Sequence, residues 1–216
     1  MQFKSIKLKN TREVLNHTLH HIGGKVLDLG AGGAKYKGLI LKRAEEYRAC
    51  DAIKNESIDD ICDVLNLKYP EEHFDTIVST QVIEHIPNPY RMVSQIRKVL
   101  KVGGKAILTA PFLVPMHSDP DDYFRFTKDG LSEIFKQAGF EILESGHYGG
   151  FFIVMSEMIH FSWFNPYKYH KTRISRWGAG GGRIMKLIEK IATFFDRFIP
   201  TKSIFAGSYI VVRKLK

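Results

Sequence analysis

Cysteine is scarce in this chain of 216 residues, which contains only Cys50 and Cys62. Two cysteines exclude the disulfide frameworks of small secreted proteins, and we expect a fold without a disulfide in a reducing compartment. No stretch reaches the ~18 uninterrupted apolar residues of a transmembrane helix. The first residues alternate apolar and basic side chains and lack the apolar core of a signal peptide. The sequence therefore predicts a cytoplasmic protein.

Acidic residues are scarce in the last third of the chain. Residues 1–150 carry 20 Lys/Arg and 20 Asp/Glu, whereas residues 151–216 carry 12 and 3. The same stretch holds 13 of the 26 aromatic residues. The net charge of +9 therefore belongs to a basic, aromatic section attached to a neutral body, and the two need separate explanations.

Short apolar runs alternate with amphipathic segments along the neutral body. The expected strands are Lys25–Leu29, Tyr47–Asp51, a short one ending near Asp63, Phe74–Thr80, Lys105–Pro111, Phe140–Ser145 and Phe205–Arg213. The expected helices are 10–22, 36–46, 88–101 and 127–137, with Asn10 and Thr127 as caps. This alternation predicts a single α/β domain with a mostly parallel sheet covered by helices on both faces.

A glycine loop follows the first expected strand, where ligands of such sheets bind. Gly30, Ala31, Gly32 and Ala34 lie in this loop, and glycine lets a ligand approach the main chain closely. Lys35 stands where a dinucleotide fingerprint needs its third glycine, and no Gly-Lys-Ser/Thr follows as in a P-loop.

Acidic residues accompany this loop. The carboxylate of Asp28 is placed to orient the loop and attract a cationic amino group. Asp51 ends the next strand and suits a ribose diol, the alternative being a solvated strand end. Asp63 and Val64 could offer a carboxylate and a backbone N–H to an adenine edge, although Asp59 and Asp60 compete for this role.

Residues 26–34 resemble motif I of the class I S-adenosylmethionine-dependent methyltransferases. Asp51, the segment 63–67, the segment 74–89 and the segment 100–108 follow that family in order, and segment 74–89 resembles its "type 11" branch. The resemblance covers about residues 22–146, and Ala34 replaces a glycine that many members have. It implies a Rossmann-like fold with seven strands, the seventh antiparallel, and S-adenosylmethionine bound over residues 30–34.

The resemblance also implies roles for residues beyond the fourth and fifth strands. Gln81 would lie close to the cofactor, and Glu84 and His85 at the substrate side of the cleft. His117, Tyr123 and Arg125, in the loop after the fifth strand, would line the acceptor pocket, as in members associated with polysaccharide and cell-envelope biosynthesis.

Two histidines are candidates for a general base. His117 is the preferred base and His85 the second candidate, since imidazole titrates near neutral pH. The alternatives without a catalytic role are that His85 is a structural histidine and that the loop carrying His117 only covers the sheet edge. The two cysteines stand twelve residues apart and form no C-x-x-C pair, and we expect no metal.

The basic, aromatic section reads as an insertion at about residues 149–203 between the sixth and seventh strands. It contains an apolar helix candidate at 149–164, a basic loop at 165–182 and an amphipathic helix from Arg183 to Ile199. This helix suits either an anionic membrane surface or packing onto the sheet or a homodimer partner. The first reading places the protein on the inner face of the membrane.

The sequence favours methyl transfer to an oxygen or nitrogen of a small-molecule, saccharide or lipid-linked acceptor. An RNA methyltransferase that uses the basic insertion is the competing enzyme, although no RNA-recognition signature accompanies it, so nucleic acid is disfavoured. A non-catalytic cofactor-binding scaffold protein is the alternative of another class.

Overall fold

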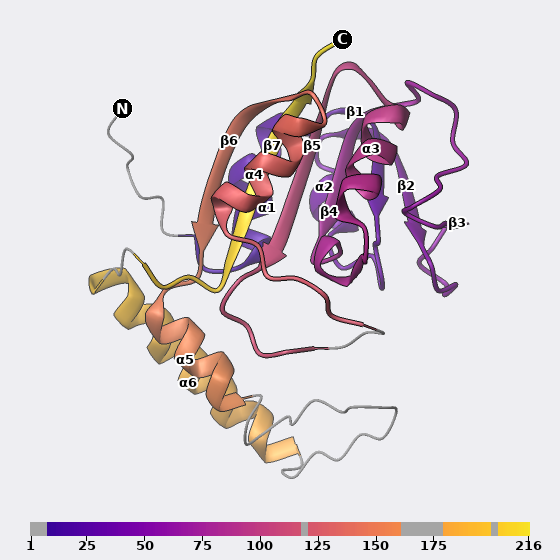
Figure 1. Cartoon of the computed structure of the whole chain (residues 1–216). Helices are drawn as coiled ribbons and strands as arrows, with labels where there is room; N and C mark the ends of the chain where they lie inside the picture. Colours follow the sequence, from indigo (N-terminus) through magenta and orange to yellow (C-terminus); the bar gives the residue numbers. More distant parts are fainter. Residues whose placement is uncertain (1–7, 118–120, 161–178, 200–202) are drawn as a thin grey trace.

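The chain forms a seven-stranded sheet with the strand order β3-β2-β1-β4-β5-β7-β6 (Figure 1). The computed structural model describes residues 8–117, 121–160, 179–199 and 203–216, without the side chains of 179–186. The strands are β1 (Gly24–Leu29), β2 (Ala44–Asp51), β3 (Asp60–Ile61), β4 (Phe74–Thr80), β5 (Leu100–Pro111), β6 (Phe140–Tyr148) and β7 (Gly207–Lys214). Only β7 is antiparallel to its neighbours, β5 and β6. The expected fold class is confirmed.

Helices cover both faces of the sheet. The helices α1 (Thr11–Thr18) and α2 (Lys37–Ile40) lie on one face, and α3 (Pro89–Val99) and α4 (Lys128–Gln137) on the other (Figure 1). Successive strand residues point to opposite faces, so neighbours in one strand join different cores. Val26 packs in the cluster of α1 and α2, whereas Leu27 packs in that of α3 and α4.

The helix starts follow from local capping. The side chain of Asn10 accepts a hydrogen bond from the N–H of Glu13, and that of Thr127 from the N–H of Gly130. Both caps were expected, and each satisfies an N–H group that the helix itself leaves unpaired.

The expected helix at residues 36–46 is wrong beyond Ile40. The helix α2 ends there, and β2 already begins at Ala44, which pairs with Gly24 of β1. Ala44 and Tyr47 pack against the core cluster around Val26, so strand pairing and burial override the helical pattern.

The expectation of a chain without a disulfide is also wrong. Cys50 and Cys62 are disulfide-bonded, with their Cα atoms 5.7 Å apart. The parallel pairing of β2 with β3 places Cys50 opposite Asp60 and brings the two cysteines together. The bond joins the residues that come immediately before Asp51 and Asp63.

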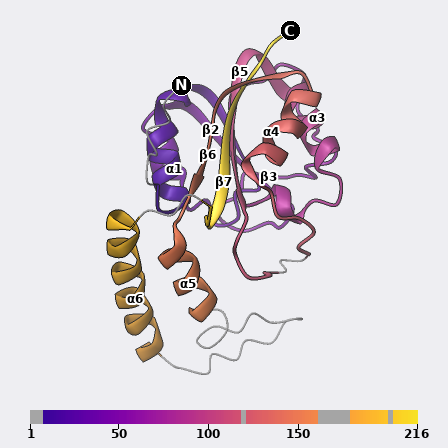
Figure 2. The same cartoon turned by 60° about the vertical axis from the view of Figure 1, so that its left-hand side comes forward.

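The insertion leaves the sheet at the edge where β4 and β5 end. Pro111 and Tyr148 both pair with Gly207 there. Beyond this edge, α5 (Phe151–Ile159) lies beside α6 (Ala179–Phe198) (Figures 1 and 2). Both expected helices are present, and α6 starts before Arg183. Most of the expected loop at 165–182 lies outside the described residues. Among the residues that the structure describes, no helix is long and apolar enough to cross a membrane.

Candidate functional site

The glycine loop after β1 is hydrogen-bonded to the end of β2. The N–H groups of Gly30 and Ala31 donate to the carbonyl of Cys50 at 2.8 and 3.1 Å. Gly30, Gly32 and Ala34 have positive φ angles of 73°, 55° and 49°. The loop therefore curls back over the strand end, as a backbone that closely encloses a ligand must.

Gly30 also touches the segment that follows β4. A Cβ atom at this position would lie 2.4 Å from Cγ2 of Val82, so only glycine fits here. The loop after β1 and the turn after β4 are thus packed against each other at one edge of the sheet.

Two predicted cofactor residues, Asp28 and Asp51, lie beside the loop. Asp28 is buried and accepts a hydrogen bond from the Tyr47 hydroxyl at 2.7 Å. Burial raises the pKa of Asp28 to about 6, while the Tyr47 hydrogen bond opposes this shift. Asp51 accepts hydrogen bonds from the N–H groups of Gly32 at 2.8 Å and Ile53 at 3.0 Å. Its carboxylate therefore lies next to the loop, on the far side from Val82.

The structure separates Asp63 from its competitors. Asp59 accepts a hydrogen bond from the N–H of Ala49 at 2.7 Å, and Asp60 pairs with Arg48 at 2.8 Å. Both acids therefore hold β2 and β3 together. Asp63 is exposed just beyond β3, and its side chain accepts only a local hydrogen bond, from the N–H of Leu65, among the bonds recorded for the described residues.

Gln81 follows β4 directly and has a positive φ of 57°. Its side-chain amide donates to the hydroxyls of Thr109 at 3.0 Å and Tyr148 at 2.9 Å. Gln81 thus ties the ends of β4, β5 and β6 together. Sequence reasoning missed Tyr148, although it is a buried tyrosine whose hydroxyl needs a partner.

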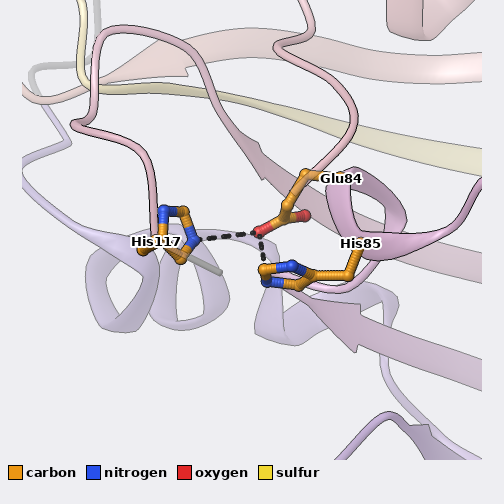
Figure 3. Close-up of side chains that lie close together, drawn as sticks. All are labelled: Glu84, His85 and His117. Carbon is orange, nitrogen blue, oxygen red and sulfur yellow. Dashed lines mark ion pairs between the residues drawn. The ribbon is translucent and has the colours of Figure 1, made fainter. Parts of the chain in front are cut away.

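Three polar side chains meet beside this point: Glu84, His85 and His117 (Figure 3). Glu84 is fully buried, and its Oε1 lies 3.7 Å from His85 Nε2 and 3.8 Å from His117 Nε2. Glu84 and His85 belong to the 3-10 turn Ile83–His85 after β4, whereas His117 lies in the loop after β5. Adjacent strand ends thus bring together residues that lie far apart in the sequence.

Hydrogen bonds fix the loop that carries His117. The N–H groups of Tyr123 and Phe124 donate to the carbonyl of Glu84 at 2.8 and 3.2 Å. The N–H of His117 donates to Asp122 at 3.0 Å, and Arg125 pairs with the same carboxylate at 2.6 Å. Asp122 was missed by the sequence reasoning, although its spacing of three residues from Arg125 was a signal.

The remaining predicted residues of this loop are occupied by loop contacts. Arg125 also donates to the carbonyls of Val114 and Pro115 at 3.3 Å. Tyr123 is half exposed, and its hydroxyl donates to Asp121 at 3.2 Å. The guanidinium therefore braces the loop, whereas the tyrosine ring remains accessible at the edge.

Electrostatics distinguish His117 within the cluster. The adjacent Glu84 carboxylate raises the pKa of His117, with a smaller opposing effect of burial and further support from the Pro115 carbonyl and Asp122. The spacing of residues in the sequence indicated no such cluster, because its members come from two loops.

Comparisons with known proteins agree with this geometry. A family model described as a methyltransferase domain matches residues 27–108. The 27-O-demethylrifamycin SV methyltransferase of Amycolatopsis mediterranei is 26% identical over 110 residues, covering 43% of this chain and 40% of that protein. The phosphatidylethanolamine N-methyltransferase of Cereibacter sphaeroides is 27% identical over 107 residues, covering 42% of this chain and 52% of that protein.

A solved structure extends the likeness to nearly the whole chain. Phosphoethanolamine N-methyltransferase 2 of Haemonchus contortus, in complex with S-adenosyl-L-methionine, aligns with a TM-score of 0.61 at 16% identity, covering 98% of this chain and 54% of that one. The matched segment spans about half or less of the length of the curated relatives named above. Residues 27–108 thus match a methyltransferase domain, and the chain has the seven-stranded fold of a methyltransferase that binds S-adenosyl-L-methionine.

Proposed function

We propose that the protein transfers the methyl group of S-adenosylmethionine to an oxygen or nitrogen atom of an amphiphilic, lipid-linked small molecule. One observation carries the proposal: the α5–α6 pair, with its apolar exposed face, lies at the same sheet edge as the glycine loop and the Glu84–His85–His117 cluster. An acceptor with a polar head and an apolar tail would meet matching surfaces there.

The residues around the glycine loop fit the cofactor. Gly32 and Gly33 have open space beside the main chain, and Asp51 stands at the strand end where a ribose diol would bind. Asp63 and Val64 are the candidates for the adenine edge, and Gln81 lies where β4 ends. When bound, the cofactor supplies an electrophilic methyl group on a sulfonium. The chain's own contribution is to hold this group in line with the acceptor atom.

The acceptor side is assigned to the polar cluster and its loop. His117 and His85 are the proposed catalytic residues, because their nitrogens face the buried Glu84 at the edge beyond β4. An acceptor hydroxyl must lose its proton, and a positioned basic group assists this step. Tyr123 and the loop braced by Arg125 would cover the acceptor from the β5 side.

The apolar surface of α6 supports an amphiphilic acceptor. Leu187, Ile191, Phe194 and Phe198 recur on one helical face and are 59, 48, 58 and 63% exposed. The opposite face packs on α5, where the buried Ala192 lies. Leu187, Ile191 and Phe198 belong to the apolar stripe expected from the sequence, and Phe194 extends their exposed face.

The packed face is held by a specific polar contact. Asp196 of α6 accepts hydrogen bonds from the N–H groups of Phe152 and Ile153 at the start of α5, both at 3.0 Å. Because these hydrogen bonds fix the rotation of α6 about its own axis, its apolar face is exposed to solvent. The basic residues Lys190 and Arg197 are exposed as well. An apolar face flanked by cationic side chains suits an anionic membrane surface.

Cofactor affinity should depend on the ionisation of Asp28. With a pKa of about 6, its carboxylate is charged at pH 7 and attracts the ammonium group of the cofactor, but is mostly neutral at pH 5. We expect the dissociation constant for S-adenosylmethionine to rise about tenfold from pH 7 to pH 5, measured by isothermal titration calorimetry. Asp28→Asn should bind weakly at both pH values, whereas the exposed-site control Glu45→Gln should follow the wild type. A pH-independent wild-type affinity contradicts this role.

The acceptor class is tested by following the transferred methyl group. The protein is incubated with S-adenosylmethionine labelled in the methyl group and with cell lipids, aqueous metabolites or RNA in separate reactions. We expect label in the lipid fraction and a loss of about 100-fold or more in His117→Ala, because a group that activates the acceptor contributes this much. Cofactor affinity of the variant should stay within about twofold. Label confined to RNA or to water-soluble metabolites contradicts the proposal.

The α6 face is tested by sedimentation with liposomes containing anionic lipid at physiological salt. The double variant Leu187→Glu, Phe194→Glu should reduce the partition coefficient at least about tenfold, since each buried apolar side chain contributes about 1.5–3 kcal/mol. Val102→Glu, at an exposed valine near the opposite edge of the sheet, is the matched control. Two results would assign the face to a protein contact instead. One is wild-type protein that stays in the supernatant, and the other is a wild-type dimer that the double variant disrupts.

A further inference from the structure

The Glu84–His85–His117 cluster has the composition of a metal site. One carboxylate oxygen and two imidazole nitrogens lie within 4.8 Å of one another. The rings of His85 and His117 are nearly perpendicular, at 89°, with their centroids 5.2 Å apart. Two nitrogen ligands and one carboxylate are the donor set of many zinc and iron sites in proteins.

Backbone carbonyls orient both imidazoles toward Glu84. Nδ1 of His117 lies 3.1 Å from the carbonyl oxygen of Pro115, and Nδ1 of His85 lies 2.5 Å from that of Asp121. A carbonyl oxygen only accepts, so each Nδ1 carries the proton in these contacts. A neutral ring then has its lone pair on Nε2, the atom that faces Glu84 in both residues. Metal-bound histidines are held in this way by a hydrogen bond from their other nitrogen.

Glu84 supplies an independent observation. Both of its carboxylate oxygens are buried, and neither has a hydrogen-bond partner among the described residues. A buried carboxylate without hydrogen bonds is costly, and the Nε2 atoms of His85 and His117, at 3.7 and 3.8 Å, lie beyond hydrogen-bond distance of Oε1. A cation between the three ligand atoms would compensate the buried charge of Glu84.

We propose that Oε1 of Glu84 and the Nε2 atoms of His85 and His117 bind one divalent transition-metal ion, with Mn²⁺ or Zn²⁺ as the chemical type. In a tetrahedral site, metal–ligand bonds of about 2.0–2.2 Å place the ligand atoms roughly 3.3–3.6 Å apart. The present separations of 3.7 and 3.8 Å require only a small contraction. Mixed nitrogen and oxygen ligands favour these ions over Mg²⁺ and Ca²⁺, which prefer oxygen alone.

Three protein ligands leave coordination positions open for an acceptor, and this role of the site rests on the proposed function. A metal ion lowers the pKa of a coordinated hydroxyl, so that its proton passes to water. The acceptor oxygen then bonds to the methyl carbon, while the bond from that carbon to sulfur breaks and leaves its electron pair on sulfur. The metal is unchanged, no oxidant is needed, and His85 and His117 act on the acceptor through the ion.

The site is tested by titrating tag-free, chelator-treated full-length protein with Mn²⁺ or Zn²⁺ alone, using calorimetry and, for Mn²⁺, the electron paramagnetic resonance signal of the free ion. We expect saturable one-to-one binding that weakens at least about tenfold in His117→Ala and in His85→Ala. His20→Ala, at an exposed histidine outside the cluster, is the matched control and should bind like the wild type. Thermal unfolding and circular dichroism of each variant verify that it is folded.

The binding test uses neither cofactor nor acceptor, so its outcome is separate from that of the proposed function. No saturable binding, or binding that both cluster variants retain, overturns the site. In the labelled-methyl assay we expect chelator treatment to reduce transfer at least about tenfold and added Mn²⁺ or Zn²⁺ to restore it. Full transfer in the presence of chelator overturns the catalytic role of the metal and leaves His117 as a base without a metal.

Discussion

The arrangement of the site depends on how the glycine loop is joined to the end of β2. Three consecutive N–H groups donate to this strand end: those of Gly30 and Ala31 to the carbonyl of Cys50, and that of Gly32 to the carboxylate of Asp51. These bonds fix the loop backbone in conformations with positive φ and set Asp51 beside it. A ligand held against the loop main chain is therefore within reach of the same acid.

The ends of β4 and β5 build the other half of the site from the same edge. Glu84 is buried within the turn after β4. Hydrogen bonds to its backbone carbonyl hold the loop that places His117 beside its side chain. The insertion starts after β6 at this edge as well, so α5 and α6 lie beyond the same strand ends as the polar cluster. The glycine loop, the polar cluster and the start of the insertion thus lie at the same end of the sheet.

Local patterns in the sequence were sufficient to predict the α/β fold class, the glycine loop, and the caps at Asn10 and Thr127, because these depend on neighbouring residues. Contacts between distant segments were not predictable in this way. The disulfide between Cys50 and Cys62 arises from the pairing of β2 with β3, and the meeting of Glu84 with His117 arises from adjacent strand ends. The end of α2 at Ile40 has the same cause, since the residues from Ala44 onward pair with β1 as strand β2.

The central claim is that S-adenosylmethionine binds over the glycine loop with its ribose at Asp51, and calorimetry with wild-type protein and Asp51→Ala tests it most directly. The account predicts one cofactor per chain for the wild type and at least about tenfold weaker binding for the variant, because hydrogen bonds from a diol to a charged group contribute about 1.5–3 kcal/mol each. No heat of binding for the wild type, or equal affinities of the two proteins, would contradict it.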